Sequence, residues 1–215
     1  MSPVPYDDRS QAGRELAALL GHLAGQDVVV LGLPRGGLPV AAEVARALDA
    51  PLDVLVVRKL GVPWHPELAM GAVAGGDVRV LNDDVIAGMG VSPSQLDAVT
   101  ERERHEVARR EQTYRDGRPA EQVAGRRAVV VDDGLATGAT AAAAVRAVRA
   151  RGASPVVLAV PVGAPDTVQR LQAVADEVVC TATPEHFLSV GGHYRDFRPV
   201  TDQEVRQTLT EARSD

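Results

Sequence analysis

The amino-acid sequence predicts an α/β protein whose mostly parallel central sheet is flanked by helices on both faces. Apolar runs rich in Val and Leu alternate along the chain with amphipathic or Ala-rich segments, which is the order of repeated strand–helix units. These runs are continuously apolar, as is typical of strands buried on both faces of a parallel sheet. Only 3% of the 215 residues are aromatic, so the core is expected to consist of Val, Ala and Leu.

The expected strands are short apolar runs bounded by Gly, Pro or charged residues. They cover residues 27–33, 51–59, 125–133, 154–162 and 177–180. Residues 68–82 are expected to form a β-hairpin that turns at Gly75 and Gly76, because this pair joins two short apolar runs. Helices are expected at 36–49, 92–115, 136–152, about 165–174 and about 201–212. The helix at 92–115 has Ser92 as its N-cap and Pro93 at its first position.

The length fits one domain over residues 1–215, with a core of about 25–180 and a C-terminal segment of about 181–215. The formal charge of −6 argues against general nucleic-acid binding, which needs a basic surface. The single cysteine, Cys180, excludes an internal disulfide and suits a reducing compartment. Its apolar neighbours favour a small buried side chain.

The N-terminal residues have neither the charged start nor the apolar core of a signal peptide. No apolar run approaches the roughly 20 residues needed to cross a bilayer. A soluble cytoplasmic protein without a membrane partner is therefore expected.

Three expected strands are followed by chemically unusual segments. They are PRGG after the first strand, RKLGVPWHPE at the end of the second and DDGLATGAT after the strand at 125–133. In open parallel sheets ligands bind beyond the carboxyl ends of the strands. The convergence of these segments at one edge is the main functional signal.

Residues 136–140 lie between a strand and an Ala-rich helix, which is the setting of an anion site. Unpaired N–H groups and the helix dipole bind phosphate at such a helix start. Gly138 allows close approach of the backbone, and Thr137 and Thr140 add hydroxyl groups. The alternative is a plain N-cap at Thr137 without a ligand. No GK[ST] follows, so the segment is not a Walker P-loop.

Asp132 and Asp133 are adjacent carboxylates at a strand end, and they repel each other unless cations or hydroxyl donors meet them. A ribose diol and a hydrated Mg²⁺ both satisfy that need. A solvated turn and a phospho-acceptor pair, as in receiver domains, are the alternatives.

The stretch AVVVDDGLATGAT, residues 128–140, resembles the signature of the type I phosphoribosyltransferases. The family pattern is a hydrophobic strand, two acidic residues and a small-residue phosphate loop. Gly134 departs from the apolar residue usual at its position. Within the family the chain is most similar to bacterial members of unassigned acceptor substrate, in which PRGG, RKLG and a late YxDF occur together.

The resemblance implies that Asp132 and Asp133 contact the ribose hydroxyls of 5-phosphoribosyl-1-pyrophosphate (PRPP), directly or through Mg²⁺. It implies a 5′-phosphate loop formed by Ala136, Thr137, Gly138, Ala139 and Thr140. It also implies pyrophosphate contacts from Pro34, Arg35, Gly36, Gly37, Arg58 and Lys59. In this family the loop that corresponds to residues 34–37 often contains a strained or cis peptide. A turn with a surface arginine at 34–37, and cations at a strand exit at 58–59, are the alternatives.

A small hood or lid over the acceptor is expected from the C-terminal segment and the β-hairpin insertion. Trp64 and His65 belong to the expected lid, and Phe187, Tyr194 or Phe197 would stack on the acceptor. The alternatives are a surface position for His65 and packing of the C-terminal aromatic residues onto the domain.

The implied reaction transfers the 5-phosphoribosyl group of PRPP to a nitrogenous base or another small nitrogen acceptor and releases pyrophosphate. Asp132, Asp133, Arg35 and Lys59 are the expected catalytic residues, with Mg²⁺ as cofactor. The 6-oxopurine enzymes carry an acidic residue where this chain has Ala136, so a 6-oxopurine acceptor is disfavoured.

Two alternatives from other classes are a PRPP-binding regulator without turnover and a partner-binding protein with a vestigial site. The resemblance and the long charged helix at 92–115 suggest a homodimer, although a solvated helix face with i,i+4 ion pairs explains the charges more simply.

Overall fold

The computed structural model describes residues 6–212, and its centre is a five-stranded parallel sheet of order β2-β1-β6-β7-β8. The strands are β1 (Val28–Gly32), β2 (Leu52–Val54), β6 (Arg127–Val131), β7 (Val156–Val162) and β8 (Glu177–Ala182). The expected parallel sheet is therefore confirmed. The register pairs Gly32 of β1 with Val131 of β6, so the loops after these two strands leave the sheet side by side.

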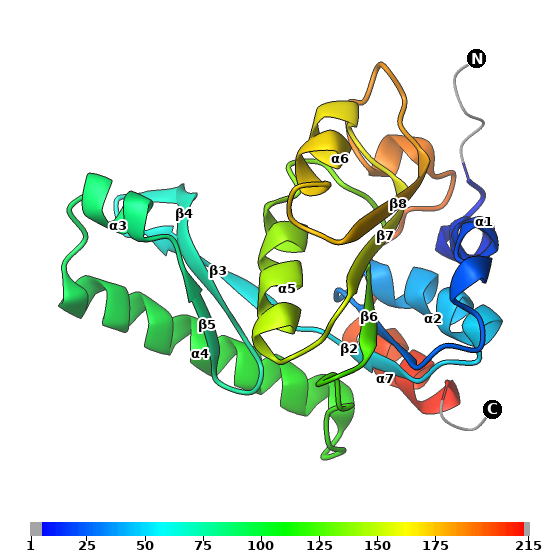
Figure 1. Cartoon of the computed structure of the whole chain (residues 1–215), viewed down its shortest axis with the longest axis horizontal. Helices are drawn as coiled ribbons and strands as arrows, with labels where there is room; N and C mark the ends of the chain where they lie inside the picture. The colour runs from blue at the N-terminus through cyan, green and yellow to red at the C-terminus, as the bar shows by residue number, and fades with distance from the viewer. Residues whose placement is uncertain (1–5, 213–215) are drawn as a thin grey trace.

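Helices cover both faces of this sheet (Figure 1). On one face lie α1 (Arg9–Leu19), α2 (Gly37–Leu48) and α7 (Asp202–Glu211), and on the other lie α5 (Ala139–Ala150) and α6 (Pro165–Leu171). Two 3-10 turns, Gly21–Leu23 and Gly191–His193, complete this part. The strands are continuously apolar because alternate residues serve opposite cores. Val28 and Val30 pack with α1 and α2, whereas Val29 and Leu31 pack with α5.

A second unit, which we call the arm, extends from the central sheet to the left of Figure 1. It contains the antiparallel strands β3 (Val57–Val62), β4 (His65–Ala74) and β5 (Val78–Leu81) and the helices α3 (Asp83–Gly88) and α4 (Pro93–Arg115). The arm sheet packs against both α4 and α5. The predicted hairpin turn at Gly75 and Gly76 is confirmed as the turn between β4 and β5.

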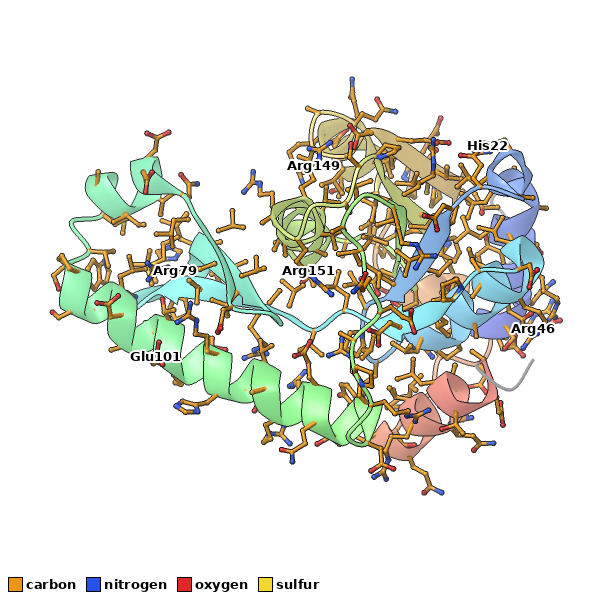
Figure 2. The ribbon with its side chains drawn as sticks, turned by 60° about the horizontal axis from the view of Figure 1, so that its bottom comes forward. His22, Arg46, Arg79, Glu101, Arg149 and Arg151 are labelled. Atoms are coloured by element: carbon orange, nitrogen blue, oxygen red, sulfur yellow. The ribbon has the colours of Figure 1, made fainter. Side chains whose placement is uncertain are left out.

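The α4 helix begins as the sequence predicts. Ser92 accepts from the N–H of Gln95, and the Gln95 side chain accepts from the N–H of Ser92, which makes a capping box ahead of Pro93. Ion pairs three and four residues apart run along the helix, as between Glu106 and Arg110. In Figure 2 Glu101 lies on α4 with Arg79 of β5 nearby, whereas His22 and Arg46 lie at the opposite end of the molecule.

The structure corrects three expectations about the elements. The expected strand at 51–59 is two strands in different sheets, because the buried residues Leu55 and Val56 carry the chain from β2 into β3. The helix expected from residue 136 begins at Ala139, because Gly138 is its N-cap in a left-handed conformation, with φ of 71°. The helices α1 and α3 were not expected.

Two further expectations concern membrane-spanning helices and Cys180. Within residues 6–212, no helix combines the length and the apolar character needed to span a membrane. Cys180 is partly buried in β8, and burial raises the pKa of its thiol to about 11. The thiol is thus protonated at neutral pH, which agrees with a packing role.

Candidate functional site

The PRGG loop and the acidic pair meet at the carboxyl ends of β1 and β6. The N–H of Leu33 donates to the carbonyl of Val131 at 2.8 Å. A Cβ on Gly37 would lie 2.7 Å from that same carbonyl oxygen, and one on Gly36 would overlap the carboxylate of Asp133. The Pro34–Arg35 peptide bond is cis. The two glycines therefore let the loop pack directly on the acidic pair.

The acidic pair lies in a setting that disfavours two negative charges. Burial raises the pKa of Asp132 well above its ordinary value, and the charge of Asp133 raises it further. Burial also raises the pKa of Asp133, against the opposing effect of Arg9, whose Nε lies 2.8 Å from Oδ2 of Asp133. The N–H of Asp133 donates to Oδ1 of Asp132 at 2.9 Å. The pair is thus two crowded carboxylates with one cation in contact.

The expected phosphate loop enters α5 through Gly138. Two of its carbonyl groups are held by α6: Thr167 donates its hydroxyl to the carbonyl of Ala136, and Arg170 donates to that of Thr137, both at 2.8 Å. The first N–H groups of an α-helix have no partner within the helix. Because Ala139 and Thr140 are exposed, the start of α5 can receive an anion.

Asp132 and the phosphate loop border one hollow of about 180 Å³. Its wall consists of Asp132, the continuous stretch from Gly134 to Ala141, and Val190 of the C-terminal segment. A carboxylate therefore faces the same space as a helix start. One acid of the pair and the expected phosphate loop thus lie at the same hollow.

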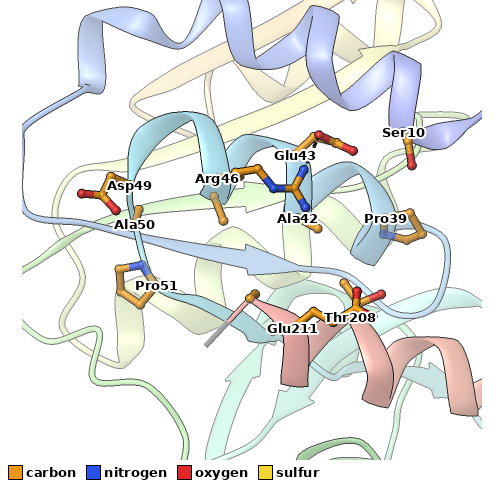
Figure 3. A pocket seen from close by; sticks show the side chains of 12 residues that line it. Ser10, Pro39, Ala42, Glu43, Arg46, Asp49, Ala50, Pro51, Thr208 and Glu211 are labelled. Atoms are coloured by element: carbon orange, nitrogen blue, oxygen red, sulfur yellow. Dashed lines mark hydrogen bonds and ion pairs between the residues drawn. The ribbon is translucent and has the colours of Figure 1, made fainter. Parts of the chain in front are cut away.

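A larger hollow of about 400 Å³ lies between α2 and α7 (Figure 3). Within it Glu43 and Arg46 pair with each other at 2.6 Å, and Asp49 and Thr208 also contribute to its wall. Its wall contains none of the residues expected to bind a ligand. Its size alone does not make it the functional site.

Arg58 and Lys59 belong to the arm, not to the rim of the central sheet as expected. Arg58 lies on the α4 side of β3, with its Nε 2.8 Å from the buried carboxylate of Glu103. Lys59 instead lines a hollow of about 160 Å³ that includes Ala139 of α5. Only Lys59 thus lies on the side of the phosphate loop. Arg35 is half-exposed, and its Nη1 lies 3.6 Å from Oδ1 of Asp202.

The aromatic residues of the C-terminal segment mainly pack together. The Tyr194 hydroxyl donates to the carbonyl of Asp133 at 2.6 Å, and its buried ring lies 5.5 Å from Tyr6 and 5.1 Å from Phe197. Phe187 stacks on His193 at 5.4 Å. For Tyr194 this arrangement favours packing of the segment over stacking on an acceptor.

The other expected lid residues lie at the turn between β3 and β4. Trp64 is 52% exposed and belongs to the short turn that His65 ends as the first residue of β4. The segment expected as a lid is therefore the end of a hairpin. The indole ring of Trp64 remains open to solvent.

Arg9 is a site residue that the sequence did not reveal. It is 8% exposed, contacts Asp133, donates Nη1 to the carbonyl of Arg198 at 3.0 Å and lies 4.0 Å from the ring centre of Phe197. It is 124 positions from Asp133 in the chain and outside every recognised motif. The only local signal was Asp8, which can cap a helix and thereby place Arg9 on its first turn.

Comparisons with known proteins identify the family of the chain. The family described as "Phosphoribosyl transferase domain" matches residues 7–198. A protein of Mycobacterium tuberculosis (strain H37Rv) named "Putative phosphoribosyl transferase Rv0571c" is 56% identical over 210 residues, which are 98% of this chain and 47% of that protein. The chain thus spans about half the length of this curated relative.

A solved structure supports the fold. The protein TT1426 from Thermus thermophilus matches with a TM-score of 0.89 and 45% identity, over 96% of this chain and 98% of that one. A purine phosphoribosyltransferase from Pyrococcus horikoshii is a remote match, with 20% identity, a TM-score of 0.47 and coverage of 90% and 92%. On the strength of the family match, which includes the acidic pair, the phosphate loop and Arg9, this chain belongs to the phosphoribosyl transferase domain family.

Proposed function

We propose that this chain transfers the 5-phosphoribosyl group of PRPP to a nitrogenous base or another small nitrogen acceptor and releases pyrophosphate. One observation carries the proposal: Asp132 and the start of α5 face the same hollow. A ribose 5-phosphate presents hydroxyl donors and an anion on one small ring. It therefore offers each part of the hollow the partner that its charge requires.

The roles of the residues follow from their positions. The residues from Ala136 to Thr140 bind the 5′-phosphate through N–H groups and hydroxyls, and the acidic pair binds the ribose hydroxyls. The PRGG loop with Arg35 lies beside the acidic pair and receives the pyrophosphate. Lys59, on the α5 side of the arm, adds a second cation for phosphate oxygens.

A Mg²⁺ ion fits this site. Asp132 is a partly buried carboxylate whose pKa is raised by burial and by Asp133, so a cation beside it relieves a real electrostatic cost. Within residues 6–212 no group of three or more Asp, Glu, His or Cys side chains could hold a metal ion. This suits Mg²⁺, which commonly takes one or two carboxylates and completes its shell with substrate phosphates and water. When bound, the ion would supply positive charge to the pyrophosphate.

In the proposed reaction the bond from the anomeric carbon to the pyrophosphate oxygen breaks, and a bond from that carbon to the acceptor nitrogen forms. The electron pair leaves with pyrophosphate, where Arg35 and Lys59 stabilise the added charge. The ribose becomes cationic in the transition state, and the nearby carboxylate of Asp132 opposes that charge. The loop and the acids fix the sugar while its anomeric carbon remains open to the acceptor.

A PRPP-binding regulator is the second candidate, and Ala136 is the observation that favours it. Position 136 is exposed at the mouth of the phosphate loop, and a methyl group there cannot accept a proton from the acceptor nitrogen. A regulator needs only the part of the site that binds PRPP. A transferase needs an acceptor that loses its proton readily or brings its own base.

Calorimetric titration of PRPP with Mg²⁺ tests both candidates, with wild type compared with Asp132→Asn. Wild-type binding that the substitution weakens supports the site, and absence of binding by wild type refutes both candidates. A pyrophosphate-release assay over a panel of purines, pyrimidines and amines then separates them. Release with at least one acceptor supports transfer, and binding without release supports regulation.

A further inference from the structure

A hollow between the arm sheet and α5 has no role in the proposed function. Its volume of about 160 Å³ is well above the space that one water molecule needs. In Figure 1 α5 lies between the arm and the central sheet, and it packs against all three arm strands. Most of the wall is aliphatic, from Ala69, Ala72, Val80, Leu81, Ala142 and Ala143.

Small residues on both sides create this space. Ala139, Ala142 and Ala143 are spaced three and four positions apart on α5, so they lie on one face of the helix. Across the hollow, β4 contributes Gly71 and Ala72. None of these side chains is longer than a methyl group. The helix and the strand therefore pack together without filling the space between them.

The wall of the hollow carries two cations and no acid. Lys59 follows Arg58 in β3, and successive strand residues point to opposite faces. Arg58 pairs with Glu103 on the α4 side, and Lys59 lines the hollow on the α5 side. Arg146, two turns into α5, is the second cation. In a chain with a formal charge of −6, this wall is a local positive site.

These two cations have few partners in the protein. Within residues 6–212, Arg146 forms no ion pair or hydrogen bond. Arg149, one turn further along the same helix, instead pairs with Asp176 at 2.8 Å. Lys59 has only the contacts of 3.3 Å and 3.4 Å with the carbonyl and carboxylate of Glu67. Both cations can therefore receive an anion without breaking a strong internal pair.

Asn82 adds a neutral donor to the same wall. Its side-chain oxygen accepts from the N–H of Val85 at 3.4 Å, which leaves its NH₂ group to donate. A predominantly aliphatic wall with a few polar groups is the usual construction of a small-molecule site. Here the polar groups are all donors, so the ligand that they fit is an acceptor with negative charge.

We propose that this hollow binds a small organic anion, a carboxylate or a phosphate ester on a compact apolar group, with Arg146 as its main cation. Ala139 is the one residue that borders both this hollow and the hollow at Asp132. Lys59 also serves phosphate oxygens in the proposed function, whereas Arg146 has no role there. The ligand contacts the arm and α5 at once, and its binding does not depend on PRPP.

Titration of isotope-labelled protein with benzoate and with phenyl phosphate, followed by amide NMR shifts at constant ionic strength, tests the proposal. We expect saturable shifts at Gly71 and Ala142 with at least one probe. Saturation by benzoate alone indicates a carboxylate ligand, and saturation by phenyl phosphate alone indicates a phosphate ester. Benzamide, which is neutral, should bind more weakly than the better probe. Equal binding of benzamide, or no saturation with either anion, would overturn the proposal.

Arg146→Gln tests the assigned cation. It should weaken binding of the better probe about fivefold or more, because a charge-assisted contact is lost. Arg149→Gln is the matched control, since it removes a cation from the same helix outside the hollow, and it should bind as wild type does. Unchanged affinity for Arg146→Gln, or an equal loss for both variants, would overturn the proposal.

Ala142→Leu tests the space itself. It fills the hollow and leaves both cations in place, so the saturable shifts at Gly71 should disappear. Ala150→Leu, at the exposed end of the same helix, is the control and should bind as wild type does. Binding by Ala142→Leu equal to that of wild type would overturn the proposal. Arg146 is exposed, so its substitution should not impair folding, and it decides the matter if Ala142→Leu does not fold.

Discussion

Gly36 lies so close to Asp133 that any Cβ at position 36 would overlap the Oδ2 atom of that carboxylate. The backbone of Gly36 is ordinary, with φ of −61° and ψ of −31°, so its conformation does not demand glycine. The space does. Glycine at this position leaves room for the loop to rest on the acidic pair.

Gly36→Ala should therefore damage the site by pushing Asp133 away from Arg9. We expect the free energy of unfolding to fall by about 1–3 kcal/mol and PRPP affinity to fall with it. Urea unfolding and calorimetry measure the two effects. Gly21→Ala is the control, because a Cβ at Gly21 meets nothing within 4 Å. Equal results for the two variants would contradict the packing described.

Gly138→Ala should lower affinity for ribose 5-phosphate through two separable effects. The positive φ of 71° disfavours a side chain by about 1 kcal/mol. A Cβ would also lie 2.7 Å from Cγ2 of Thr167 and disturb the loop. Gly25→Ala has a similar φ of 75° with no neighbour within 4 Å, so it reports the conformational effect alone. Only Gly138→Ala should weaken ribose 5-phosphate binding in a titration.

Asp132→Asn should stabilise the ligand-free protein, and more so at higher pH. Burial raises the folded-state pKa of Asp132 above its ordinary value of 3.8, so the folded state prefers the protonated form. Ionisation therefore costs stability, which is lost as pH rises from about the unfolded value through the folded pKa. Above that window the Asn variant should be more stable than wild type.

Urea unfolding of both proteins from about pH 4 to about pH 8 measures this difference. Asn retains an oxygen that can accept from the N–H of Asp133, so the hydrogen bond is preserved. A stability gap that is the same at every pH would show that Asp132 titrates normally in the folded protein.

Neighbouring cations of the arm should respond differently to the same substitution. Arg58→Met removes a partner of the buried Glu103 and should lower the free energy of unfolding by roughly 1 kcal/mol. Lys59→Met loses only long contacts with Glu67, at 3.3 Å to its carbonyl and 3.4 Å to its carboxylate, and should leave stability unchanged while it weakens PRPP binding. Chemical unfolding and calorimetry on both variants check this. A larger loss of stability for Lys59→Met than for Arg58→Met would reverse the assignment.

The central sheet was predictable because its strands are apolar on both faces, and runs such as Val129–Val131 leave no other burial pattern open. The start of α4 was predictable from Ser92 and Pro93, whose capping chemistry is local. The division of residues 51–59 was not, because Leu55 and Val56 are as apolar as a continuous strand would be. Apolarity reports burial and not the sheet to which a strand belongs.

The proximity of candidate site residues was predictable where they are contiguous in sequence. Asp132 and the phosphate loop lie within residues 132–140, so the hollow that they border follows from one strand–loop–helix unit. Arg9 and Tyr194 reach Asp133 from the two ends of the chain. No local pattern encodes such contacts. The glycines of the PRGG loop were recognised, but their close packing on Asp133 and Val131 needs the three-dimensional arrangement.

The grip of Arg9 and Tyr194 on Asp133 bears on how the protein can be divided. A fragment cut to the strand-and-motif core, at about residues 25–180, would keep the PRGG loop, the acidic pair and residues 136–140. It would also leave one acid of the pair without its counter-ion and without the phenol that anchors its carbonyl. Both flanks are therefore structural parts of the surroundings of Asp133, and we expect the smallest autonomous unit of this protein to be longer than its signature suggests.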